Sequence, residues 1–148
     1  MKSFTLITLL ILLVSACASK DITAQFHRKE MKTEGFTKHF EESLFKITGK
    51  GLFSVELLIK DHLEIGRNDF ALIIHDNRDR DVEGARLKIV SRMPGSNITI
   101  EPIVKEKGYG LYNVENLLVG EPGQWEFTLN IEKDGIEDSL VFNLQALK

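Results

Sequence analysis

Cysteine is almost absent from this chain of 148 residues, in which Cys17 is the only one. A single cysteine excludes a disulfide framework and a thiolate metal cluster within one copy of the protein. An excess of one charge is missing too, since 19 basic and 22 acidic residues give a net charge of −3. Without a basic field to attract phosphates, we expect no nucleic-acid partner.

The motifs of common enzyme classes are also missing. The sequence has no nucleophile elbow and no histidine-rich motif, so nothing in it predicts a serine or cysteine beside a base. Gly108-Tyr109-Gly110 lacks the later glycine and the helix that a phosphate-binding loop needs. We therefore expect a binding protein rather than an enzyme.

A long apolar run occurs at the N-terminus. It extends from Phe4 to Val14 after the basic residue Lys2, and it ends at Val14-Ser15-Ala16-Cys17. This order resembles a bacterial lipoprotein signal, in which an aliphatic residue stands three places before the lipidated cysteine. The run is about half the roughly 20 residues that a membrane-spanning helix requires. A retained signal-anchor helix and a secretory signal cut elsewhere are the alternatives.

The lipoprotein hypothesis predicts a location. Residues 1–16 would be removed, and lipid on Cys17 would hold the mature protein to a membrane of the bacterial cell envelope, outside the cytoplasm. Ala18 is not an aspartate, so the retention signal for the inner membrane is missing. In a Gram-negative host we therefore expect the outer membrane, facing the periplasm.

The composition divides the rest of the chain in two. Residues 17–42 carry closely spaced charges and few large apolar side chains, which predicts a tether; a short helix from Thr23 to Lys32 is the alternative. Residues 43–148 are enough for one domain with a hydrophobic core.

Apolar residues alternate with polar ones along residues 43–148, and turn residues interrupt the pattern about every eight to twelve positions. This texture predicts an all-β fold, an immunoglobulin-like antiparallel β-sandwich of about seven strands. One alternate set should face inward, with Trp125 in the core, and polar residues such as Glu56 should face water. The runs that carry the pattern are Phe53 to Ile59, Phe70 to Ile74, Leu87 to Ile89, Ile98 to Ile100, Leu111 to Val119, Trp125 to Ile131 and Leu140 to Leu144.

The segment from Gly66 to Ile131 resembles the YtkA-like and FixH-like extracytoplasmic domains. The resemblance rests on Val82-Glu83-Gly84-Ala85, on Met93-Pro94, on Gly108-Tyr109-Gly110-Leu111-Tyr112 and on Glu121-Pro122-Gly123-Gln124-Trp125. It implies an immunoglobulin-like sandwich with a role in copper handling or in the assembly of a copper-dependent respiratory oxidase.

Several members of that family carry methionine and histidine near the Met-Pro turn as candidate copper ligands. Here Met93-Pro94 is followed by Gly95-Ser96-Asn97-Ile98, without a histidine or second methionine, so the soft cluster that selects Cu(I) is missing at that place. His75 and Met93 are the remaining candidate metal ligands, and copper is the candidate cofactor. The other histidines, His27, His39 and His62, are outside candidates.

An acidic loop runs from Asp76 to Gly84. Asp79, Asp81 and Glu83 fall at the first, third and fifth positions of an EF-hand-type loop, but Val90 stands where a bidentate glutamate is needed. We expect a solvated hairpin loop rather than a calcium site.

These observations predict a lipid-anchored binding module of the bacterial envelope with an envelope protein as partner. Copper delivery or oxidase assembly is its expected use, through the family resemblance. The alternative is a structural or adhesive module that docks to another protein through a sheet edge or its loops.

Overall fold

The computed structural model describes residues 21–148. The expected signal peptide and the lipidation site Cys17 lie outside the described residues. None of the helical segments within residues 21–148 has the length and apolar character needed to span a bilayer. The elements are η1 (Ile22–Gln25), β1 (Arg28–Thr33), β2 (Phe36–Phe40), β3 (Leu44–Ile47), β4 (Phe53–Leu58), β5 (Leu63–Glu64), β6 (Gly66–Asp76), β7 (Arg86–Arg92), β8 (Thr99–Ile100), β9 (Ile103–Gly108), β10 (Leu111–Val119), β11 (Gly123–Lys133) and β12 (Ile136–Leu147).

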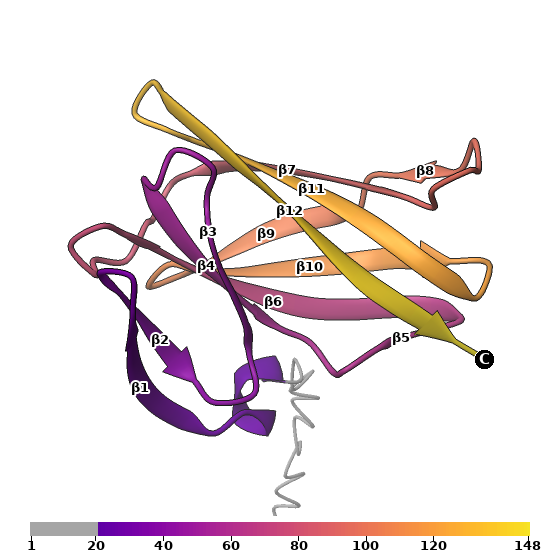
Figure 1. The fold of residues 1–148 in the computed structure, drawn as a ribbon, viewed down its shortest axis with the longest axis horizontal. Coiled ribbons are helices and arrows are strands. Elements are labelled where there is room, and N and C mark those ends of the chain that lie inside the picture. Colours follow the sequence, from indigo (N-terminus) through magenta and orange to yellow (C-terminus); the bar gives the residue numbers. More distant parts are fainter. Residues whose placement is uncertain (1–20) are drawn as a thin grey trace, which may run out of the picture.

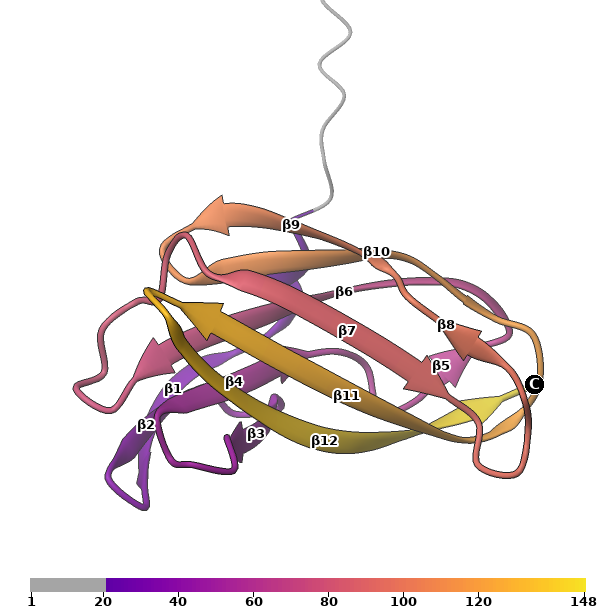
Figure 2. The ribbon, with the colours of Figure 1, turned by 90° about the horizontal axis from the view of Figure 1, so that it is seen from above.

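Two five-stranded sheets pack face to face (Figures 1 and 2). The first has the strand order β3-β4-β6-β10-β9 and the second has the order β5-β12-β11-β7-β8. All pairs are antiparallel except the short pairing of β5 with β12. The prediction of an all-β antiparallel sandwich is confirmed, with twelve strands in residues 21–148 rather than about seven.

The alternating pattern explains how the core is filled. Along β11, Trp125, Phe127, Leu129 and Ile131 are buried between the sheets, as predicted, while their neighbours point outward. Strand β11 pairs with β12 over the whole length of β11, and the ring of Phe127 stacks on that of Phe142 with centroids 4.9 Å apart. One side of each sheet thus forms a continuous apolar core.

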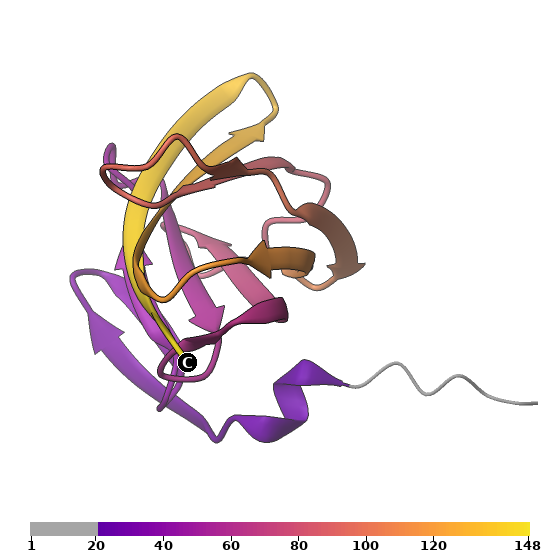
Figure 3. The ribbon, with the colours of Figure 1, turned by 90° about the vertical axis from the view of Figure 1, so that its right-hand side faces the viewer.

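Residues 21–42 differ from the expected tether and from the alternative helix. They form η1 and a β1–β2 hairpin, here called the N-terminal arm, which lies outside the two packed sheets (Figures 1 and 3). Glu34 and Gly35 join the strands with positive φ angles of 50° and 86°. Such angles belong to the two-residue turns that suit the twist of a hairpin. The charged composition reflects β1, whose residues are nearly all exposed.

Candidate metal centre

A small polar layer is buried between the N-terminal arm and the outer face of the sheet that contains β4 and β6. Ser54 and Glu56 on β4 point to this outer face because the inward positions are taken by Phe53, Val55 and Leu57. Ser54 pairs with His75 on β6, which places His75 diagonally beside Glu56. His39 on β2 covers them and is also buried.

Glu56 corrects one prediction. Alternation placed its side chain on the outer face, where we expected water, but Glu56 is completely buried under the arm. Its carboxylate accepts hydrogen bonds from the backbone N–H of His39 (2.5 Å), from Nδ1 of His39 (2.9 Å), from the N–H of Phe40 (3.0 Å) and from Oγ of Ser43 (2.7 Å). These four bonds offset the cost of removing a carboxylate from water.

His75 has one nitrogen in use and one free. Its Nε2 lies 3.0 Å from Oδ1 of Asp81, so Nε2 carries the proton of the neutral ring and Nδ1 presents a lone pair. This Nδ1 is buried and has no hydrogen-bond partner in the described part of the chain. Burial, followed by the nearby His39, lowers the pKa of His75. The ring is therefore neutral at pH 7, as a metal ligand must be.

His39 has a related arrangement. Its Nδ1 faces Glu56, while its Nε2 lies 3.7 Å from Oδ1 of Asp79. The two imidazole rings lie with centroids 4.3 Å apart and planes inclined by 32°. Each ring thus turns one nitrogen toward an aspartate and its Nδ1 toward the buried side. Carboxylates in this outer position orient the histidine ligands of many metal sites.

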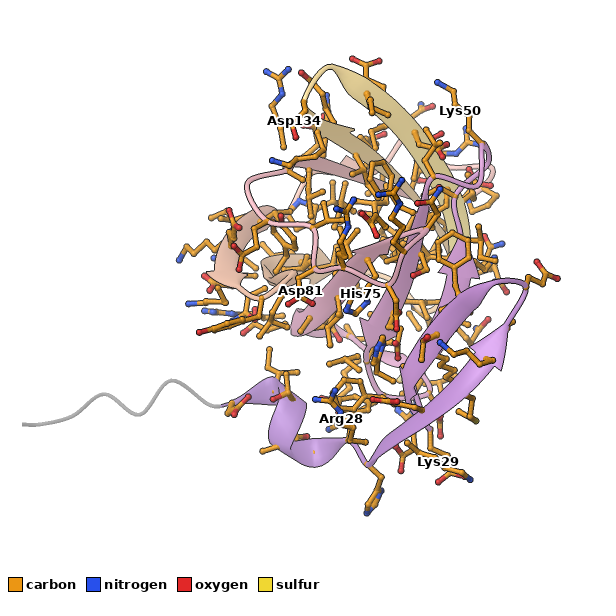
Figure 4. The ribbon with its side chains drawn as sticks, turned by 90° about the vertical axis from the view of Figure 1, so that its left-hand side faces the viewer. Arg28, Lys29, Lys50, His75, Asp81 and Asp134 are labelled. Carbon is orange, nitrogen blue, oxygen red and sulfur yellow. The ribbon has the colours of Figure 1, made fainter. Side chains whose placement is uncertain are left out.

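The loop that carries these aspartates is exposed from Asn77 to Asp81, as expected for a solvated loop, but two of its carboxylates also face the buried histidines. Asp76 caps the loop by accepting hydrogen bonds from the backbone of Arg78 and Arg80, which fixes the path of the chain. Asp79 then faces Nε2 of His39, and Asp81 contacts Nε2 of His75. Figure 4 shows His75 and Asp81 beside each other, with the labelled Arg28 and Lys29 on the arm.

His39, Glu56 and His75 together form a donor set for a metal ion. One ligand atom from each lies within 4.8 Å of the others, and all three residues are buried. Two imidazoles and one carboxylate form a ligand set found for Zn²⁺, and imidazole also suits Cu²⁺. A metal ion on Nδ1 of His39 would displace the proton that this atom shares with Glu56. Three protein ligands leave one coordination position for water or another ligand.

The structure places the predicted pair of metal ligands apart. His75 belongs to the cluster. Met93 follows Arg92 at the C-terminal end of β7, whose seven residues span about 20 Å. Met93 packs against the core, and its methyl group stands 3.3 Å from the position that a Cβ would take on Gly123. The outside candidate His39 lies in the cluster; His27 pairs instead with Glu42, and His62 lies in the loop between β4 and β5.

Sequence reasoning missed Glu56 and gave His39 little weight. Both residues are separated from His75 along the chain, so no ligand spacing was visible. The available signal was the glutamate at an alternating position of a strand whose other residues, apart from Ser54, are apolar. The pair Glu34-Gly35 was a signal for the hairpin turn of the arm, but not for the face on which the hairpin packs.

No protein-family model and no curated protein matches this chain. Solved structures with a similar shape include the following two. An endo-β-1,4-mannanase from Thermotoga petrophila is 16% identical over 66% of this chain, with a TM-score of 0.44, and the chain spans only 20% of that protein. The ZirS C-terminal domain is 12% identical, with a TM-score of 0.46, and the match covers 100% of this chain and 99% of the domain. Ligand and activity must therefore be inferred from the residues of this chain.

Proposed function

We propose that the protein is a lipid-anchored, extracytoplasmic module of the bacterial envelope that binds a divalent transition-metal ion between His39, Glu56 and His75. Its role is binding rather than catalysis. The lipoprotein-like signal that ends at Cys17 supports the anchor and the location. The family resemblance connects the domain with copper handling or with the assembly of a respiratory oxidase, through an envelope protein as partner.

One observation supports the metal site above all others, namely the buried and unpaired Nδ1 of His75. A buried polar atom without a partner costs about 1–3 kcal/mol, so its presence needs an explanation. Here the atom belongs to a neutral ring, and ligand atoms of a second imidazole and of a carboxylate lie within 4.8 Å of a nitrogen of that ring and of each other. A metal ion would satisfy this atom.

The chemistry of the donor set narrows the choice of ion. The three residues offer nitrogen and oxygen but no sulfur. Met93 follows the C-terminal end of β7, away from the cluster. Nitrogen and oxygen donors favour Zn²⁺ or Cu²⁺, whereas Cu(I) selects thiolates and thioethers. If the protein handles copper, it would hold Cu²⁺ at this site.

Isothermal titration of the full chain in detergent with Zn²⁺, and separately with Cu²⁺, tests the proposal. We expect one ion per chain. The variant His75→Phe should weaken binding by more than about 100-fold, because even the loss of an outer-layer partner costs 10–100-fold. The variants Met93→Leu and His62→Ala serve as controls and should bind as the wild type does. Absence of binding, or binding unchanged in His75→Phe, would contradict the proposed site.

The alternative is a structural or adhesive module, for which the exposed strand β9 is the relevant feature. Strand β9 forms one edge of its sheet, and an exposed edge can add a strand from a partner. Its Lys105 and Lys107 are exposed. Lysines on an edge are a common protection against such pairing. The buried cluster therefore supports metal binding more strongly.

A further inference from the structure

The N-terminal arm is attached to the sandwich by a small number of contacts. Its hairpin forms a separate two-stranded sheet that shares no backbone ladder with either sheet of the sandwich. Residues of β1 are nearly all exposed. An isolated two-stranded hairpin is at best marginally stable in water, so the order of the arm depends on its attachment to the sandwich.

That attachment includes an apolar part and a polar part. The first is a small apolar cluster in which Leu58, Ala71 and Ile73 of the sheet pack against apolar residues of the arm, among them Phe26 and Phe40. The second is the polar layer, where the carboxylate of Glu56 accepts the N–H groups of His39 and Phe40. Figure 3 shows the arm lying against the outer face of one sheet.

The candidate metal ligands come from both sides of this junction. His39 belongs to the arm, while Glu56 and His75 belong to β4 and β6 of the sandwich. An ion coordinated by all three would therefore join the arm to the sandwich. Opening of the arm would remove His39 from the site, so the closed arm must bind the ion more tightly than the open arm does.

We infer that the metal site is a lock, in which a bound divalent ion holds the N-terminal arm closed on the sandwich and loss of the ion releases it. This inference rests on the proposed function. The arm joins the sandwich to the N-terminal segment that contains Cys17. A released arm of 22 residues (21–42) would behave as a coil with a reach of about 25 Å. Metal occupancy would then control the distance and orientation of the domain relative to the membrane.

Limited trypsin digestion of the full chain in detergent measures the opening of the arm. Arg28, Lys29 and Lys32 lie in β1 and are exposed, but trypsin cuts an ordered strand only after local opening. When opening and closing are fast, the cleavage rate follows the population of the open form. With free Zn²⁺ at 100 times its dissociation constant, and no binding to the open arm, cleavage at these sites should slow about 100-fold.

The matched variant is His39→Phe. Phenylalanine keeps a ring against His75 and the backbone bonds to Glu56, but it offers no nitrogen to a metal. Its cleavage without metal should be faster than that of the wild type, because the bond from Nδ1 of His39 to Glu56 is lost. Addition of Zn²⁺ should change the cleavage rate of the variant less than about threefold, whereas it slows the wild type about 100-fold. His62→Ala, whose histidine lies outside the cluster, should retain the full effect and shows that trypsin itself is not inhibited.

The outcomes separate the two proposals. If titration shows one ion bound through His75 while Zn²⁺ changes arm cleavage less than about threefold, the lock is wrong and the metal site stands. If no ion binds, both proposals fail. Slowing in the wild type and in His62→Ala that is absent in His39→Phe would support the lock.

Discussion

The variant His75→Phe separates a binding role of His75 from a structural one. Phenylalanine has nearly the same ring, so it leaves no cavity beside His39. The change removes the unpaired Nδ1, which should stabilise the metal-free protein by about 1–3 kcal/mol. It also removes the bond from Nε2 to Asp81, worth about 0.5–1.5 kcal/mol, and the exposed carboxylate returns to water. The metal-free variant should therefore be as stable as the wild type or more stable.

Bound metal should make the wild type more stable than the variant. For the wild type at 100 times the dissociation constant, a bound ion adds about 2.7 kcal/mol, which corresponds to about 10 °C in melting temperature for a domain of this size. The variant should show no such shift. Trp125 is the only tryptophan and is fully buried, so its fluorescence reports thermal unfolding in both proteins.

Two results would refute this reasoning. A metal-free variant that is more than about 2 kcal/mol less stable than the wild type would show that His75 supports the fold through contacts that outweigh its unpaired nitrogen. A metal-induced shift that persists in the variant would show that the ion binds elsewhere.

Two further predictions concern the fold. Trp125→Ala should lower the free energy of unfolding by about 3–5 kcal/mol, as measured by thermal unfolding followed by circular dichroism; a melting temperature within a few degrees of wild type would contradict the central position of Trp125. Asp138→Asn tests a second buried carboxylate. Burial raises the pKa of Asp138, but hydrogen bonds to its carboxylate lower the pKa by more, so the net pKa lies below the usual value. The largest lowering comes from the hydroxyl of Thr48, followed by the N–H groups of Lys50, Ser139 and Leu52. The variant should be about 1–3 kcal/mol less stable at pH 7. Because a lowered pKa gives stability that is complete above the unfolded pKa of about 3.9 and lost as the pH falls through the folded value, the difference should shrink below about pH 4. A difference that stays constant down to pH 3 in thermal unfolding would argue against a charged role for Asp138.

The sequence was sufficient to predict which side of most strands faces the core. The alternation of Trp125, Phe127 and Leu129 with polar residues is a local property, and one buried face determines it. The turn residues that interrupt the alternating pattern are also a local signal; at Asp134-Gly135, between β11 and β12, both residues adopt the positive φ angles that such turns require.

The arm and the centre beneath it could not be predicted in the same way. Alternation tells which face of β4 carries Glu56, but it does not tell what covers that face. The arm buries a polar layer as well as an apolar one, so β2 lacks the clean apolar alternation of a core strand. His39, Glu56 and His75 come together only through the long-range packing of three strands.

The position of β12 in its sheet has a consequence for the order in which the protein can form. Strand β12 lies between β11 and β5, so it is an interior strand of the second sheet although it follows every other described strand in the sequence. During synthesis, β5 has no partner strand in the second sheet, and that sheet cannot complete its cover of the first sheet, until Ile136–Leu147 has been made. The sandwich therefore cannot close until residues 136–147 have been made, and removal of β12 would expose the core rather than an edge.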